Sequence, residues 1–147
     1  HHYDGIHLSS NPQFWLDNKR LTEAFYHAAK SQATVRRIFI TDDRYITQLM
    51  PVMEEQAKHL IQVKYITKKE LQDIFSFQDI CCCYSETKCN YTNFTSRQLS
   101  DQLADTVISN YSSSVYSCND VSIAQAKKMF NSIWNNDLAH SVIIPDR

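Results

Sequence analysis

The chain has 147 residues, the size of one ordinary domain, and its 15 basic and 16 acidic side chains give a formal net charge of −1. Gly5 is the only glycine, where average usage predicts about ten. Phosphate-cradling loops, dinucleotide fingerprints and nucleophile elbows need glycines, so the composition excludes these function classes. Because the charge is nearly balanced and no apolar run is long enough for a membrane span, we expect neither nucleic acid nor membrane as a partner.

The first part of the chain predicts alternating helices and strands. The segment after Gly5 is expected to be irregular as far as Asn11, and the spacing of apolar residues then predicts a helix from about Pro12 to Ala33. A β-branched and aromatic run predicts a strand over Thr34–Thr41. A second helix with an apolar stripe is expected from about Arg44 to Ile61, with a kink or a break at Pro51.

The alternation continues through the middle of the chain. Val63–Thr67 is expected to form a second strand, and Thr67 with Glu70 forms a capping box that opens a short helix. A third strand is expected over Asp79–Tyr84. Helical crossovers imply parallel strands, so the predicted fold class is α/β, with a mostly parallel or mixed sheet flanked by helices. We expect a single domain over residues 1–147, either complete or as a piece of a longer protein.

The remaining elements carry weaker signals. The prediction has, in chain order, a hairpin turn at Ser85–Lys88, a strand to Thr95, a helix around Leu99–Ile108, a polar loop at Ser109–Ser114, a short strand at Val115–Cys118, a helix at Asp120–Asn135 and a tail at Ala139–Ile144 that extends or docks.

Five cysteines bear on compartment and metal binding. Three of them are adjacent, at Cys81–Cys83, and an odd number in this arrangement makes a poor disulfide framework. No C-x-x-C or H-x₃₋₅-H spacing typical of zinc sites is present. We therefore expect buried free cysteines in a reducing, cytoplasmic environment, which the lack of an apolar leader in the first residues also favours, and neither a metal nor a cofactor.

Four charged residues are the candidate ligand-binding set: Arg37, Asp42, Asp43 and Asp79. Asp42 and Asp43 follow the first predicted strand, and ligands of open α/β sheets bind at the carboxyl ends of strands. Capping the next helix is the alternative role for this pair. Arg36 and Arg37 should point to opposite faces of their strand, where one of them binds an anion or pairs with Asp79, or makes an ordinary salt bridge.

The acidic pair resembles that of response-regulator receiver domains, in which two acidic residues hold magnesium beside a phosphorylated aspartate. At the end of the third predicted strand, where that family has the aspartate, this chain has Tyr84, Ser85 and Glu86. The resemblance implies an alternative function as a receiver-like phospho-acceptor or a small magnesium-dependent hydrolase that uses Asp42 and Asp43.

The order of four segments resembles the phospholipase-D-like sensory domains of bacterial regulatory proteins. The segments are Phe14-Trp15 at the start of a helix, the strand Val35–Ile40, the strand and helix Val63–Leu71 leading to Asp79-Ile80, and the late run Met129–Trp134. The resemblance spans about Tyr3 to Asn136 and implies an α/β fold with a mixed sheet.

The catalytic signature of that family, histidine-any-lysine, does not occur here, and His27-Ala-Ala-Lys30 has a different spacing. The resemblance therefore implies a non-catalytic sensory, ligand-binding or protein-interaction domain of a bacterial signalling protein, whose partner is a small ligand or another protein. A third interpretation is a homo-oligomeric module whose aromatic face forms the interface.

Overall fold

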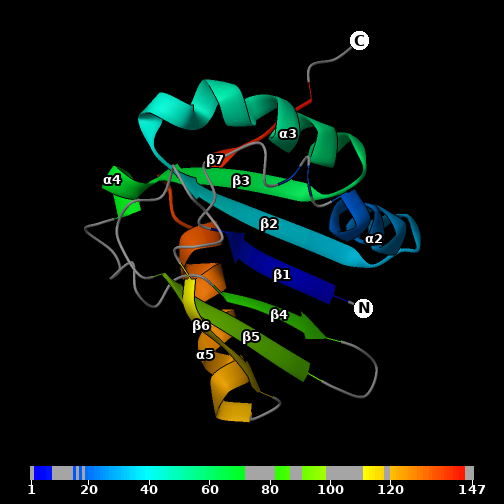
Figure 1. The fold of residues 1–147 in the computed structure, drawn as a ribbon, viewed down its shortest axis with the longest axis vertical. Coiled ribbons are helices and arrows are strands. Elements are labelled where there is room, and N and C mark those ends of the chain that lie inside the picture. The colour runs from blue at the N-terminus through cyan, green and yellow to red at the C-terminus, as the bar shows by residue number, and fades with distance from the viewer. Residues whose placement is uncertain are drawn as a thin grey trace.

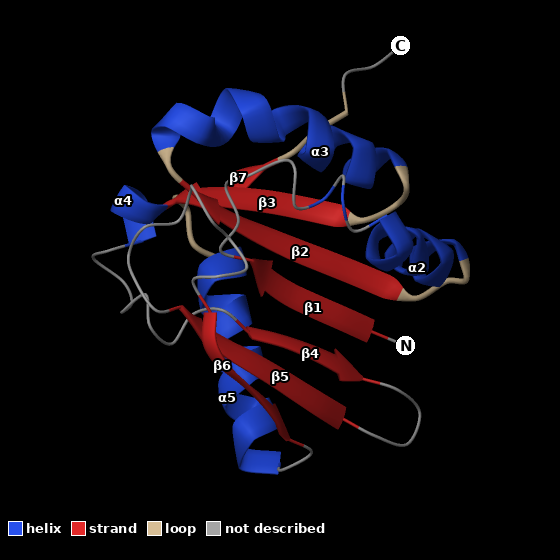
Figure 2. Ribbon diagram, in the orientation of Figure 1, coloured by secondary structure: helices blue, strands red, loops and turns tan. Residues whose placement is uncertain are grey.

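A seven-stranded mixed sheet with helices on both faces forms the framework of the protein (Figure 1, Figure 2). It is seen in a computed structural model that describes residues 2–7, 15, 17, 19–71, 82–86, 91–98, 111–117 and 120–144. In the described parts of 82–120, and at 21, 122, 123, 125 and 126, the description covers the backbone. The predicted α/β fold class is confirmed.

The strands lie in an order that differs from their order along the chain. From one edge to the other they are β6 (Tyr111–Ser117), β5 (Tyr91–Gln98), β4 (Cys82–Glu86), β1 (His2–His7), β2 (Thr34–Thr41), β3 (Gln62–Thr67) and β7 (His140–Ser141). β1, β2 and β3 are parallel, and β7 pairs antiparallel with β3. β4, β5 and β6 form an antiparallel extension on the other side of β1. The sheet is therefore parallel at its centre and antiparallel at both edges.

The helices divide between the two faces of this sheet. They are α2 (Lys19–Lys30), α3 (Ile46–Lys58), α4 (Lys68–Leu71) and α5 (Asp120–Trp134), with the 3₁₀ turn η1 (Asp43–Tyr45) before α3. α2 and α3 join consecutive parallel strands and so cover one face, as right-handed crossovers require (Figure 1). The other face of the sheet carries α5.

Two features of the sheet correct the sequence-based prediction. The sequence predicts no strand before Thr34, yet β1 is a central strand between β2 and β4, and its last two residues, Ile6 and His7, fall in the segment expected to be irregular. The third predicted strand is observed as β4, and it runs antiparallel to β1 instead of extending the parallel set. Asp4 and Gly5 obscure the β-strand pattern, because neither is typical of a buried strand without partners from elsewhere in the chain.

The helix expected over Arg44–Ile61 is present as η1 and α3, and it continues through Pro51 without a break. A proline inside a helix removes one hydrogen bond. Here Leu49 and Met53, on either side of the proline, are fully buried against the sheet. Their packing helps to keep the residues on both sides of the proline in one helix.

The capping box at the start of α4 is confirmed. The backbone N–H of Glu70 donates to Thr67 Oγ1 at 3.1 Å, and the backbone N–H of Thr67 donates to Glu70 Oε1 at 3.1 Å. His140 of β7 lies 3.3 Å from the same carboxylate. The tail that was expected at Ala139–Ile144 is thereby docked on the edge of β3, by the short strand β7 and by the contact between His140 and Glu70.

In the second half of the chain, the antiparallel pair β4 and β5 confirms the predicted hairpin, but Ser85 and Glu86, which were expected in its turn, are the last residues of β4. The strand expected at Val115–Cys118 begins earlier, as β6, so the prediction of a polar loop is wrong for its last residues, 111–114. The expected final helix is α5, while the helix around Leu99–Ile108 lies outside the described residues. None of the described helices has the length and apolar character needed to cross a bilayer.

The apolar core between the sheet and helices α2 and α3 includes side chains from every element of this layer. Its buried members are Trp15, Ala29, Val35, Phe39, Leu49, Met53, Ile61 and Val63. Alternate residues of β2 supply this face, as the period of a strand requires.

Gly5 lies inside β1, where the neighbouring rings leave no room for a side chain. A Cβ at this position would lie 2.8 Å from His7 Nε2 and 3.1 Å from Tyr3 Cε1. The His7 ring is held against Trp15 and Phe39, with centroids 5.2 and 6.1 Å away. The lone glycine therefore serves packing within the sheet.

We expect Gly5→Ala to lower the free energy of unfolding by about 1–3 kcal/mol, the usual cost of overpacking. Urea denaturation would measure it. In a His7→Ala background the same change should cost clearly less, because the crowding ring is gone. An equal cost in both backgrounds would contradict this account of the glycine.

Candidate ligand-binding site

Among the predicted site residues that the structure describes, Arg37 lies apart from the adjacent Asp42 and Asp43 along β2. Arg37 lies in the middle of β2 with 1% of its surface exposed. Asp42 and the exposed Asp43 follow the carboxyl end of the same strand, and Asp79 lies outside the described residues. Asp42 makes no side-chain capping hydrogen bond to η1, so the alternative capping role for that residue is not observed either.

The strand before the acidic pair is the second of the sheet, because β1 precedes it along the chain. Asp42 and Asp43 therefore do not follow the first strand, where the receiver pattern places its acidic pair. Within the described parts of the chain, no three His, Cys, Asp or Glu side chains come together as a metal site would require.

Arg37 points to the face covered by α2. Its guanidinium carbon lies 4.7 Å from the Trp15 ring centroid and 4.3 Å from that of Phe25. At these distances the negative faces of the rings stabilise the cation. Arg37 thus packs against a cluster of aromatic rings that includes Trp15 and Phe25.

His7 lies in the same cluster at the end of β1, with its ring edge-on to that of Trp15. Burial, with a further contribution from the positive charge of Arg37, lowers the pKa of His7 well below its usual range. His7 is therefore neutral in the folded protein near neutral pH.

A groove between α2 and α3 opens next to this cluster and has a volume of about 380 Å³. One wall comes from α2 and from Trp15, which precedes it in the chain, and the other from α3. The lining residues are Trp15, Lys19, Thr22, Glu23, Tyr26, Pro51, Val52, Glu55 and Gln56. Aromatic and aliphatic surfaces line this space, and charged side chains lie at its rim.

Gln56 is the most buried polar residue of the groove, with 2% of its surface exposed. Its Oε1 is also buried, and it accepts no hydrogen bond from any residue that the structure describes. A buried amide oxygen without a donor carries a desolvation cost of about 1–3 kcal/mol. Trp15 Nε1, in the same lining, is likewise buried and donates no hydrogen bond to a described residue.

Tyr26 lies at the end of the groove nearest the carboxyl end of α3. Its ring stacks on the His59 ring at a centroid distance of 3.8 Å. Burial raises the pKa of Tyr26, and the Glu55 carboxylate raises it further, against a smaller opposing effect of Arg37. Tyr26 therefore stays protonated and presents a hydroxyl near an acidic side chain.

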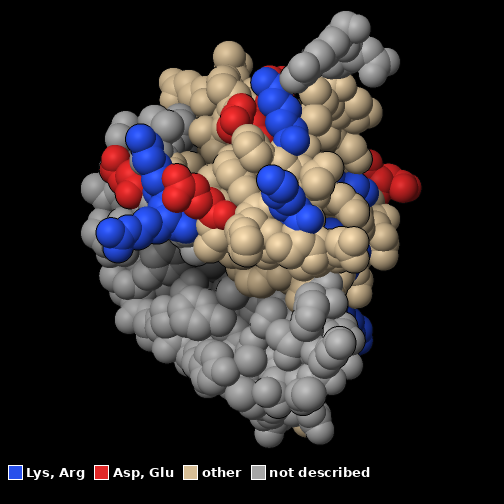
Figure 3. All heavy atoms as spheres, turned by 90° about the vertical axis from the view of Figure 1, so that its right-hand side faces the viewer, with Lys and Arg blue, Asp and Glu red and all other residues tan. Residues whose placement is uncertain are grey.

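The rim mixes the two signs of charge. On the face that carries α2, basic and acidic side chains are interspersed and form no field of one sign (Figure 3). Glu55 lies 4.0 Å from Lys58 and 3.7 Å from His59, and all three side chains are between 42% and 55% exposed. Such exposed pairs contribute little to stability and are easily exchanged for another partner.

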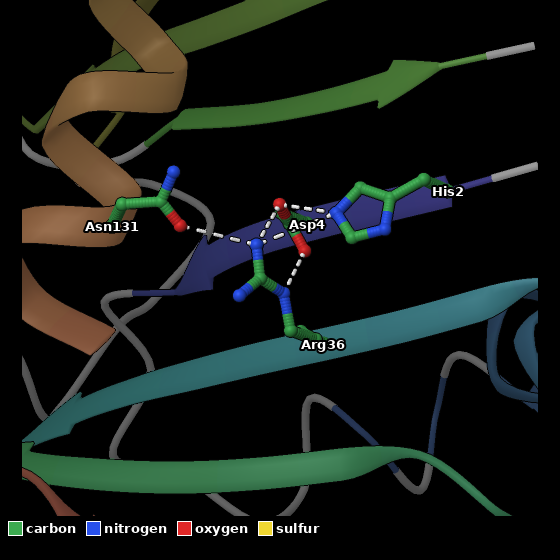
Figure 4. A network of polar contacts seen from close by, with 4 residues as sticks. All are labelled: His2, Asp4, Arg36 and Asn131. Atoms are coloured by element: carbon green, nitrogen blue, oxygen red, sulfur yellow. Dashed lines mark hydrogen bonds and ion pairs between the residues drawn. The ribbon is translucent and has the colours of Figure 1, made fainter. Parts of the chain in front are cut away.

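On the opposite face, Arg36 forms a network that sequence reasoning missed (Figure 4). Its Nε and Nη2 donate to the two oxygens of Asp4, each at 2.7 Å, and Asp4 is fully buried. Nη2 also donates to Asn131 Oδ1 of α5 at 3.2 Å. The carboxylate that Arg36 pairs with comes from β1, a strand that was not expected, while the predicted partner Asp79 lies outside the described residues.

His2 completes this network at the start of β1. Its Nε2 lies 2.6 Å from Asp4 Oδ2, and because an ionised carboxylate only accepts, Nε2 is the donor of this hydrogen bond. The separation of 3.4 Å between Nε2 and Arg36 Nη2 is then a contact between two donors. The rings of Phe130 and Trp134 lie 4.8 and 5.3 Å from the guanidinium carbon, so the network and α5 enclose the charge together.

No family model, no curated protein and no solved structure matches this chain. The assignment of a site therefore rests on the geometry of the chain itself.

We expect Asp4→Asn to destabilise the protein by about 3 kcal/mol, because it leaves the Arg36 charge without its buried carboxylate. Asp43→Asn is the matched control, since Asp43 is exposed and should change the stability by less than about 0.5 kcal/mol. Thermal and urea unfolding would measure both variants. Equal stability of the two would show that the ion pair does not hold the sheet and α5 together.

The low pKa of His7 makes stability depend on pH. The unfolded chain binds a proton at His7 below about pH 6.5, and the folded protein does not, so stability falls as the pH drops below that value. Between pH 7 and 5.5 the wild type should lose about 1 kcal/mol more than His7→Phe, which has no titrating ring. Urea unfolding at both pH values measures the difference, and identical losses would contradict a buried neutral His7.

Proposed function

We propose that this chain is a non-catalytic ligand-binding domain with a sensory or regulatory role, and that its ligand lies in the groove between α2 and α3. The observation that carries the proposal is a space of about 380 Å³ with an aromatic and aliphatic lining and a few polar side chains from both helices. Small-molecule sites typically have this combination of size, apolar walls and a few polar groups.

The walls of the groove determine how a ligand is held. They are formed by α2 and α3, whose interior backbone groups bond within each helix. Recognition therefore falls to side chains, such as Gln56, Tyr26 and the charged residues of the rim. This agrees with a chain that has one glycine, and that glycine lies in β1.

The sequence resemblance to phospholipase-D-like sensory domains supports the same role. The chain keeps the order of segments that carries the resemblance and has no histidine-any-lysine motif. Binding without turnover is the function that such a combination favours.

Tryptophan fluorescence gives a direct test, because Trp15 lines the groove and the chain has 2 tryptophans. In Trp134→Phe, Trp15 is the only remaining tryptophan, and Phe keeps an aromatic ring beside Arg36. We expect small phenyl and indolyl fragments at millimolar concentration to change its emission in a saturable way.

Two matched variants locate the binding. Thr22→Phe adds a ring inside the groove and should weaken fragment binding at least tenfold. Ala24→Phe adds the same ring on the exposed side of α2 and should leave it unchanged. Fragment binding that survives Thr22→Phe, or the absence of any saturable change, would overturn the proposed site.

A further inference from the structure

We propose that the segment from His140 to Ile144 is a pH-sensitive strap on the β3 edge of the sheet. When His140 gains a proton, the strap is held more tightly against β3. When His140 loses it, the strap opens more often and uncovers that edge. No residue of the groove between α2 and α3 takes part, so the inference goes beyond the proposed function and is tested separately from it.

The backbone attachment of the strap is small. β7 contributes two residues to the sheet, and the N–H of Val142 donates to the Val63 carbonyl oxygen at 2.9 Å. Val142 packs against the core, whereas Ile143 and Ile144 are 79% and 36% exposed. A segment with so few buried contacts opens at a low cost in free energy, so one additional interaction changes how often it opens.

The turn before the strap is held independently of β7. Asn136 Oδ1 accepts a hydrogen bond from the Leu138 N–H at 2.9 Å, and the Asn136 carbonyl oxygen accepts one from the Ala139 N–H at 3.0 Å. Lys64 Nζ donates to the Trp134 carbonyl oxygen at 2.8 Å and so keeps the end of α5 on β3. These contacts persist when β7 leaves the sheet, so opening is confined to the residues after Ala139.

His140 is the titratable side chain of the strap, and it makes the strap's side-chain contact with α4. Its Nε2 lies 3.3 Å from both carboxylate oxygens of Glu70, and its ring stacks on that of Tyr65 with a centroid distance of 4.9 Å. No other charged side chain that the structure describes contacts His140, including Lys68 and Lys69 of α4. Histidine ordinarily changes its charge between about pH 5 and 8, which sets the range in which the strap responds.

Glu70 stays ionised over this range. Burial raises the pKa of its carboxyl, but the hydrogen bonds from Thr67, followed by the charge and the hydrogen bond of His140, outweigh burial and lower the pKa below its usual value. Protonation of His140 therefore places a positive charge beside a carboxylate, whereas the neutral ring offers a hydrogen bond without the charge. The proton strengthens the contact and holds the strap on β3.

Amide hydrogen exchange of Val142 measures the opening, because its N–H bonds to β3. After correction for the intrinsic exchange rate, its protection factor should be about two- to fivefold higher at pH 5.5 than at pH 7.5, the size expected of a partly exposed ion pair. The titration of His7 lowers the global stability toward acid pH, so general unfolding has the opposite sign. Ala33, whose N–H bonds to the Ala28 carbonyl at the end of α2, is the reference amide and should not show the rise.

Two variants assign the effect to the ion pair. His140→Gln keeps a hydrogen-bond donor that cannot be charged, and Glu70→Gln keeps the capping box, in which Gln serves as well as Glu. Each should abolish the difference between the two pH values at Val142. His59→Gln removes a comparably exposed histidine beside another carboxylate, that of Glu55, and should leave the difference intact.

Several results would overturn the strap. They are equal protection of Val142 at both pH values, lower protection at pH 5.5, and exchange at the intrinsic rate throughout. A rise toward acid pH that persists unchanged in His140→Gln would do the same. None of these results bears on the groove, and a failure of fragments to bind beside Trp15 would leave the strap untouched.

Discussion

Two adjacent arginines on β2 impose the main constraint on this fold. Because neighbouring residues of a strand point to opposite faces, Arg36 and Arg37 bring a positive charge into each of the two layers beside the sheet. A buried charge is tolerated only when its surroundings compensate the lost hydration. Arg36 has a bidentate carboxylate, Asp4, and Arg37 lies against the faces of Trp15 and Phe25. The two layers therefore differ in chemistry because they compensate charge in different ways.

Compensation of Arg36 explains why β1 lies at the centre of the sheet. Asp4 is placed directly opposite Arg36 by the parallel register of β1 and β2. The same guanidinium donates to Asn131, so one side chain ties two strands to α5. The carboxylate that pairs with Arg36 is 32 residues away in the sequence. The residues of His2–His7 alone therefore cannot predict that Asp4 will be paired when it is buried. In isolation, the segment looks too polar for a buried strand.

The elements that sequence reasoning predicted well are those specified by local signals. β2 matches its predicted bounds. Ile38, Phe39 and Ile40 form a continuous apolar run, which is the pattern of a strand buried on both faces. The start of α4 follows from Thr67 and Glu70, three residues apart, whose hydrogen bonds are local. The direction of β4 could not be derived, since it depends on which edge of the parallel core remains open.

The candidate site escaped prediction for a related reason. The expectation of a ligand at the carboxyl ends of the strands selected Asp42 and Asp43, whereas the groove lies between two helices on a face of the sheet. Its lining comes from both helices, with Thr22 and Tyr26 on α2 and Val52 and Gln56 on α3. These residues meet only because both helices pack on the same sheet. The one predicted residue close to it, Arg37, contributes through the ring of Trp15 instead of touching the groove itself.

Trp15 belongs at once to the groove and to the cluster of Arg37 and His7, which gives a ligand a physical connection to the sheet. An apolar group against this ring would exclude water from the side that faces the groove. Lower local polarity strengthens the interaction between the ring and the Arg37 cation. Since His7 shares the same ring, a ligand that secures Trp15 also secures the end of β1. Under the proposed function, stabilising the packing around a buried arginine would convert occupancy of the groove into altered stability of the central sheet.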